Sequence, residues 1–101
     1  MRDESTAVKI CGVTNQYDAL MCAATGVEMI GLNFARESQR RVSREAAAEI
    51  MAGVRAAYAA VKFTGVFVNQ PLQMVTSIAD ELRLDAIQSH RDEPSEYARV
   101  S

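Results

Sequence analysis

The 101-residue chain contains 49% apolar and 24% charged residues and carries a formal net charge of −2 at pH 7. This composition is typical of a folded globular domain and excludes gross disorder, and the small net charge provides no long-range attraction for nucleic acid. We therefore expect no nucleic-acid partner. We also expect no membrane partner, because no stretch approaches the roughly 18 consecutive apolar residues of a membrane helix. The two cysteines, Cys11 and Cys22, form no CxxC pair, which favours a reducing, cytoplasmic location.

Apolar runs that alternate with helix signals predict an α/β domain with a parallel sheet. The expected strands cover residues 7–12, 29–34, 62–68 and 85–90. Three helices are expected between these strands, on one face of a sheet ordered 1-2-3-4, and a short, truncated helix is expected after Pro94. We expect a disordered leader over residues 1–6 and a single domain over residues 7–101.

Capping residues and apolar stripes position the helices. The first helix is expected to begin near Thr14 or Asn15, the second after Ser43 and the third after Asn69, because these side chains can accept a hydrogen bond from a free backbone N–H. The spacing predicts that one apolar stripe of the first helix forms its core face, consisting of Tyr17, Leu20, Met21 and Ala24.

The tetrapeptide Lys-Ile-Cys-Gly ends the first expected strand at residues 9–12. Side chains alternate between the faces of a strand, so Lys9 and Cys11 share one face. A nearby cation favours the thiolate form of a cysteine, and α/β proteins place reactive groups at strand ends. A free cysteine is, however, more often a small buried apolar residue. Cys11 is therefore a candidate base or nucleophile, with a core position as the alternative.

Arginines cluster once in the chain, between the second expected strand and the second expected helix. The cluster consists of Arg36, Arg40, Arg41 and Arg44. Such a cluster usually marks a solvated loop. The alternative is a site for phosphate or carboxylate, since a guanidinium can donate two parallel hydrogen bonds to such a group.

Five blocks occur in order along the chain: residues 8–15 followed by Asp18-Ala19, then residues 30–35, 38–43, 65–69 and 85–90. They resemble phosphoribosylanthranilate isomerase, a tryptophan-biosynthesis enzyme family built as a (βα)8 TIM barrel. The resemblance covers roughly residues 7–97 and only the first half of that barrel. Because such barrels need about 250 residues, the resemblance implies a truncated TIM barrel, a half-barrel of about (βα)3–4 units with a four-stranded parallel sheet.

The same resemblance implies roles for individual residues. The family's cysteine acts as general base in the Amadori rearrangement of N-(5-phosphoribosyl)anthranilate, which makes Cys11 the expected catalytic residue. Arg40 matches the arginine of a Ser-Pro-Arg-Tyr-Val pattern that meets the substrate carboxylate, although Gln39 and Arg41 replace the usual proline and tyrosine. The other expected substrate-binding residues are Lys9, Gln88 and His90.

Further expectations concern activity and partners. In the family, the aspartate that serves as general acid and the loops that hold the substrate phosphate belong to the second half of the barrel. No GxxxxGK[ST] or GxGxxG loop replaces them in this sequence. We therefore expect weak or absent isomerase activity, a phosphorylated small-molecule substrate if the chain is active, no cofactor or metal, and a monomer or weak homodimer. The alternatives are a non-catalytic half-barrel that associates with another half and a flavodoxin-like binding module with the same βα alternation.

Overall fold

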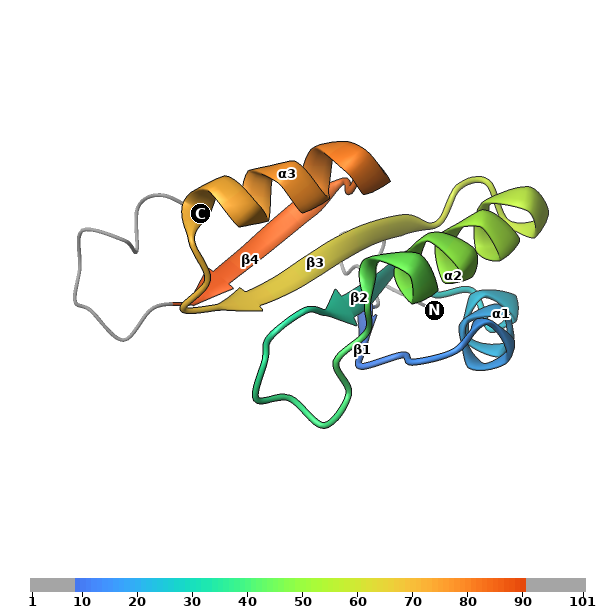
Figure 1. The fold of residues 1–101 in the computed structure, drawn as a ribbon. Helices are drawn as coiled ribbons and strands as arrows, with labels where there is room; N and C mark the ends of the chain where they lie inside the picture. The colour runs from blue at the N-terminus through green and yellow to red at the C-terminus, as the bar shows by residue number, and fades with distance from the viewer. Residues whose placement is uncertain (1–8, 91–101) are drawn as a thin grey trace.

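The computed structural model describes residues 9–90, which form a four-stranded parallel sheet and three helices (Figure 1). In chain order the elements are β1 (Lys9–Cys11), α1 (Gln16–Ala24), β2 (Met29–Asn33), α2 (Arg44–Ala57), β3 (Lys62–Val68), α3 (Leu72–Leu82) and β4 (Ala86–His90). The predicted alternation is confirmed, and β3 has the predicted bounds. The expected leader over residues 1–6 and the expected helix after Pro94 lie outside the described residues.

The strands lie in the order β1-β2-β3-β4, as predicted. All three neighbouring pairs are parallel, so the carboxyl ends of the strands meet at one edge of the sheet. The flavodoxin-like alternative is wrong, because a doubly wound sheet would place the first strand beside the third. One row of the register crosses the whole sheet and consists of Cys11, Gly31, Thr64 and Ala86.

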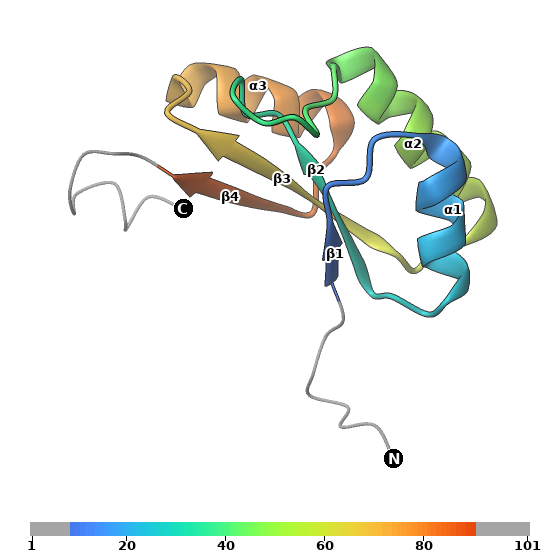
Figure 2. The same ribbon diagram turned by 90° about the horizontal axis from the view of Figure 1, so that it is seen from below.

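All three helices cover the same face of the sheet (Figures 1 and 2). The apolar side chains of β2 and β3 alternate, so that Ile30, Leu32, Phe63 and Phe67 are buried beneath the helices. Helices α2 and α3 contribute buried apolar stripes to this core, namely Ala47, Ile50, Met51, Val54, Val75, Ile78 and Leu82. No helix of the described residues covers the opposite face, which we call the inner face because it would face the axis of a barrel (Figure 2).

Two of the expected helix caps are confirmed. The Asn15 side chain accepts a hydrogen bond from the Asp18 N–H at 2.8 Å, and Ser43 Oγ accepts one from the Ala46 N–H at 3.0 Å. The expected cap at Asn69 is wrong. Asn69 has a φ of 55°, which turns the chain, and α3 begins two residues later than predicted, after Pro71, without a side-chain cap.

The expected core face of α1 is confirmed only for Leu20, which packs against the core, and is wrong for the three exposed residues Tyr17, Met21 and Ala24. Tyr17 is 70% exposed and Met21 is 55% exposed, whereas Ala19 and Ala23 are buried. Helix α1 lies close to α2, as shown by the hydrogen bond that Gln16 Nε2 donates to the Glu49 carbonyl at 2.7 Å. The small alanine side chains permit this approach, so the larger apolar residues of α1 point away from α2.

Candidate functional site

The predicted site residues gather on the inner face and at its carboxyl edge. Cys11 ends β1, Gln88 lies in β4, and Arg40 lies in the loop between β2 and α2. Lys9, Cys11 and Gln88 are all exposed, while Ile10 packs against the core on the other side of β1. In parallel α/β folds this edge is where catalytic groups are found.

The thiol of Cys11 lies over a glycine of the neighbouring strand. Gly31 is the register partner of Cys11, and a Cβ added to Gly31 would lie 2.7 Å from Cys11 Sγ. Only glycine leaves room for the sulfur in this position. Cys11 is a free and exposed cysteine, so the alternative of a buried apolar residue is wrong.

Arg40 lies against the turn that follows β1. Its Nη1 atom donates a long hydrogen bond to the Gly12 carbonyl at 3.5 Å, and a Cβ added to Gly12 would lie 2.8 Å from Arg40 Cδ. Gly12 has a φ of 87°, a conformation that other residues rarely adopt. Gly12 therefore allows both the turn and the close approach of Arg40, and the fold brings the guanidinium to the residue next to Cys11.

Lys9 and Gln88 join the two outer strands of the sheet. Lys9 Nζ donates a hydrogen bond to Gln88 Oε1, although β1 and β4 are not neighbours. Lys9 lies two register rows before Cys11, and Gln88 lies two rows beyond Ala86, so the lysine side chain crosses the row of small residues between them. No hydrogen bond joins Lys9 to the Cys11 sulfur in the part of the chain that the structure describes.

Thr64 is a polar residue of this face that the sequence analysis did not select. It occupies the same register row as Cys11 and Gly31 and is 1% exposed. Its Oγ1 atom has no hydrogen-bond partner among the described residues. In the sequence, Thr64 stands out only as a hydroxyl residue within a mainly apolar strand. Its β propensity alone explains that position.

His90 was the last residue expected to contact substrate. His90 ends β4, where its backbone pairs with Val68, but its side chain lies outside the described part of the structure. Among residues 9–90, no group of three or more His, Cys, Asp or Glu side chains is arranged to hold a metal ion. No helix in the same range is both long enough and apolar enough to cross a membrane.

Comparison with known proteins identifies the architecture. The profile of the N-(5'-phosphoribosyl)anthranilate (PRA) isomerase family matches residues 8–101. The chain belongs to this family. The PRA isomerase of Geobacter sulfurreducens is 43% identical over 90 residues, which are 89% of this chain and 43% of that protein. The Geotalea daltonii isomerase is 39% identical over 92 residues, again spanning 43% of the relative.

Solved PRA isomerases have the same fold over the matched half. The Thermus thermophilus enzyme superposes with a TM-score of 0.79 at 40% identity, covering 92% of this chain and 45% of that one. A PRA isomerase in complex with reduced 1-(o-carboxyphenylamino)-1-deoxyribulose 5-phosphate (rCdRP) gives a TM-score of 0.81 at 36% identity and is covered to 47%. The described strands and helices are thus the predicted half-barrel, and the chain spans less than half the length of the relatives it matches.

Proposed function

We propose that this chain supplies the base and the carboxylate-binding residue of a PRA isomerase site. The observation that carries the proposal is the arrangement at the end of β1. Cys11 lies over Gly31, and Arg40 contacts Gly12, the very next residue. A proton acceptor and a planar cation are thereby held side by side at the carboxyl edge of the sheet.

Cys11 and Arg40 suit two parts of the proposed substrate, the reacting sugar carbon and the anthranilate carboxylate. In the Amadori rearrangement a general acid from the other half of the barrel would protonate the ring oxygen, so that its bond to the anomeric carbon breaks and a C=N iminium forms. The Cys11 thiolate would then remove a proton from the neighbouring sugar carbon; the C–H electron pair would form the enol C=C bond, and the C=N pair would return to the nitrogen. Arg40 would bind the anthranilate carboxylate through paired N–H donors. Lys9 and Gln88 on the inner face, together with His90 at the end of β4, would contact the sugar and its substituents.

The remaining requirements of the reaction concern the other half of the barrel. Relatives extend over more than twice the matched length, so we propose that efficient turnover requires residues beyond the present half. A positioned general acid typically contributes about 10²- to 10⁴-fold in rate. The 101-residue chain is therefore expected to bind substrate analogues weakly and to turn over slowly or not at all.

We also propose that the chain is cytoplasmic and exists as a monomer in equilibrium with a weak homodimer. A four-stranded sheet has two outer strands whose free edges can pair with another chain, whereas the charged and amide groups of Lys9 and Gln88 on the inner face oppose apolar association. One related structure contains mutant-derived monomers of a PRA isomerase that is dimeric in Thermotoga maritima. Sedimentation over a wide concentration range tests this expectation, and a dimer that persists at the lowest concentrations would contradict it.

Binding of rCdRP tests the assignment of Arg40. We expect NMR titration to shift the backbone amides of Gly12, Gly31 and Gln88. Arg40→Gln should weaken binding by about 10- to 100-fold, because a hydrogen bond between charged groups is worth about 1.5–3 kcal/mol. Arg36→Gln serves as the matched control from the same loop and should leave the affinity unchanged. Equal losses for the two variants would show that charge in general, and not Arg40, holds the ligand.

Activity is tested in a tryptophan auxotroph that lacks the isomerase. The chain is expressed alone and together with the second half of the Thermus thermophilus enzyme. Growth that requires Cys11 but survives Cys22→Ala supports the catalytic assignment. Growth that persists in Cys11→Ala would overturn it. If rCdRP binds but neither culture grows, the alternative of a non-catalytic half-barrel is favoured.

A further inference from the structure

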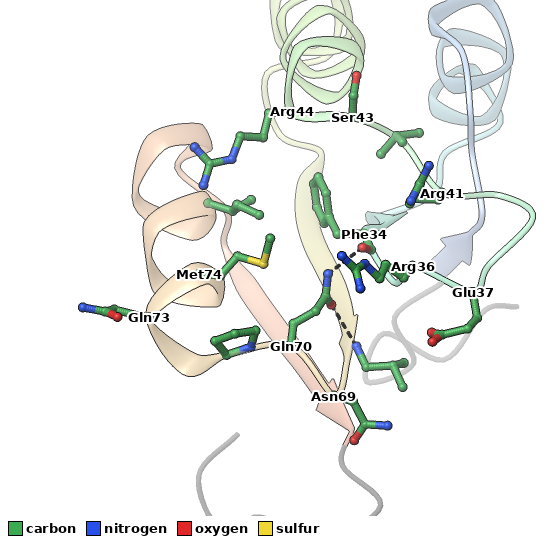
Figure 3. Close-up of a pocket in the computed structure, with 14 residues that line it drawn as sticks. Phe34, Arg36, Glu37, Arg41, Ser43, Arg44, Asn69, Gln70, Gln73 and Met74 are labelled. Carbon is green, nitrogen blue, oxygen red and sulfur yellow. Dashed lines mark hydrogen bonds between the residues drawn. The ribbon is translucent and has the colours of Figure 1, made fainter.

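A hollow lies away from the inner face, between the loop after β2 and the start of α3 (Figure 3). It has a volume of about 880 Å³, which falls in the range typical of small-molecule sites. Its lining combines the charged residues Arg36, Glu37, Arg41 and Arg44 with apolar side chains, namely Phe34, Val42, Met74 and Ile78, and we call it the loop pocket. Neither Cys11 nor Arg40 lines it, so it is separate from the proposed isomerase site.

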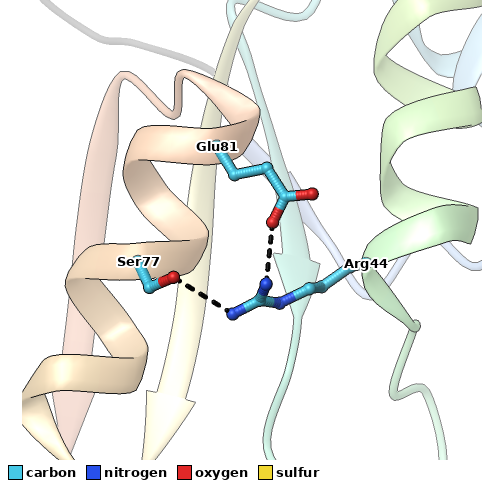
Figure 4. Close-up of polar contacts among 3 residues, drawn as sticks. All are labelled: Arg44, Ser77 and Glu81. Atoms are coloured by element: carbon cyan, nitrogen blue, oxygen red, sulfur yellow. Dashed lines mark hydrogen bonds and ion pairs between the residues drawn. The ribbon is translucent and has the colours of Figure 1, made fainter.

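The cations of the loop pocket differ in whether they are paired. Arg44 donates to Glu81 Oε1 at 2.8 Å and to Ser77 Oγ at 3.3 Å, which binds its guanidinium to α3 (Figure 4). In the described part of the chain, the guanidinium groups of Arg36 and Arg41 make no hydrogen bond and no ion pair. Both arginines are exposed, so their guanidinium groups retain their full donor capacity for an anion that enters the pocket.

Gln70 lies at the floor of the pocket, and its side-chain amide is already hydrogen-bonded. Gln70 is 8% exposed; its Nε2 atom donates to the Phe34 carbonyl at 2.7 Å, and its Oε1 atom accepts from the Val68 N–H at 3.0 Å. The Gln70 amide thus fixes the loop after β3 to the end of β2, and the two arginines remain to provide the polar contacts for a ligand.

The opposite wall of the pocket is apolar. Phe34 and Ile78 are 5% and 3% exposed, and Phe34 stacks on Phe67 with ring centroids 5.2 Å apart. Met74 is 43% exposed and projects from α3 toward the hollow (Figure 3). A flexible thioether beside an aromatic ring adapts readily to an apolar ligand group. The pocket therefore combines free guanidinium groups with an apolar surface.

We propose that the loop pocket binds a small amphipathic carboxylate. Arg36 and Arg41 take the carboxylate, and an aromatic or branched aliphatic body packs against Phe34 and Met74. Arg41, which stands where the related pattern has tyrosine, adds the second of these two unpaired cations to the pocket. Inorganic phosphate suits the pocket less well, since it would leave the apolar wall in contact with water.

NMR titration of the 101-residue chain with benzoate tests the proposal. We expect the amides of Gln73 and Met74 to shift at lower benzoate concentrations than that of Gly31. Arg36→Gln and Arg41→Tyr should each weaken binding at the loop pocket by at least about tenfold, the loss of about 1.4 kcal/mol expected for one charged hydrogen bond. Arg40→Gln is the matched control and should leave these shifts unchanged. Both altered arginines are exposed, so the variants should keep the wild-type spectrum elsewhere.

Three outcomes would overturn the proposal. The first is benzoate binding that is lost in Arg40→Gln but kept in Arg36→Gln, because it would assign the ligand to the isomerase site. The second is equal binding of neutral benzamide, which would exclude a role for the cations. The third is equal or tighter binding of inorganic phosphate, which would exclude a role for the apolar wall. Titration of the unaltered chain locates the shifts even if a variant fails to fold.

Discussion

The packing of Cys11 over Gly31 leads to a quantitative prediction for Gly31→Ala. The new methyl group would lie 2.7 Å from Cys11 Sγ and 3.3 Å from Cys11 Cα and Cβ. Overfilling a packed site costs about 1–3 kcal/mol, and alanine returns about 0.4–1 kcal/mol by restricting the unfolded chain. We expect a net loss of about 1–2 kcal/mol in the free energy of unfolding, measured by urea denaturation followed by circular dichroism.

A double-mutant cycle with Cys11→Ala assigns this loss to the sulfur. Removing Sγ eliminates the shortest contact and leaves the two at 3.3 Å, so Gly31→Ala should then cost less than about 1 kcal/mol. The coupling energy should be about 1 kcal/mol, above the roughly 0.5 kcal/mol found for independent sites. Additive effects within that limit would refute the proposed position of the thiol.

Gly26→Ala provides the matched control. Gly26 has a φ of +94° and no heavy atom within 4 Å of an added Cβ, so its substitution strains the backbone without a steric contact. The strain should cost about 1 kcal/mol, and this cost should be the same in the presence and absence of the Cys11 sulfur. A coupling equal to that of Gly31 would indicate a general effect on stability.

Two further predictions concern stability. Gln70→Leu should lower the free energy of unfolding by about 2–4 kcal/mol, because the partly buried Val68 N–H and the buried Phe34 carbonyl both lose this partner; a urea-unfolding difference below about 1 kcal/mol would contradict this role. Arg83→Gly should raise the urea midpoint by the equivalent of about 0.5–1 kcal/mol, because Arg83 follows α3 with a left-handed φ of 58°; Arg83→Ala retains the strain, and an equal gain for it would count against the explanation.

The local structure of the chain could be predicted from the sequence because its signals act within a few residues. A side chain such as Asn15 or Ser43 caps the N–H three residues later, and the apolar residues of β3 define a strand by themselves. The motif resemblance added the half-barrel, and it selected Cys11 and Arg40.

The tertiary structure decided which faces and loops meet. Helix α1 buries Ala19 and Ala23 and leaves Tyr17 and Met21 exposed, because the small side chains lie where α1 comes close to α2. Asn69 turns the chain instead of capping α3. The burial of α1 depends on the volume available beside α2, which the spacing of residues along one helix does not encode.

The contacts of the two sites also depend on the tertiary structure. Lys9 bonds to Gln88 across 79 positions of the chain, and Arg40 rests on Gly12 across 28. The arginine cluster was visible in the sequence, but only folding divided it: Arg40 points to the end of β1, Arg44 pairs with Glu81, and the loop pocket receives Arg36 and Arg41. A sequence shows which charges are close along the chain, whereas the packing of helices against the sheet determines which of them find a partner.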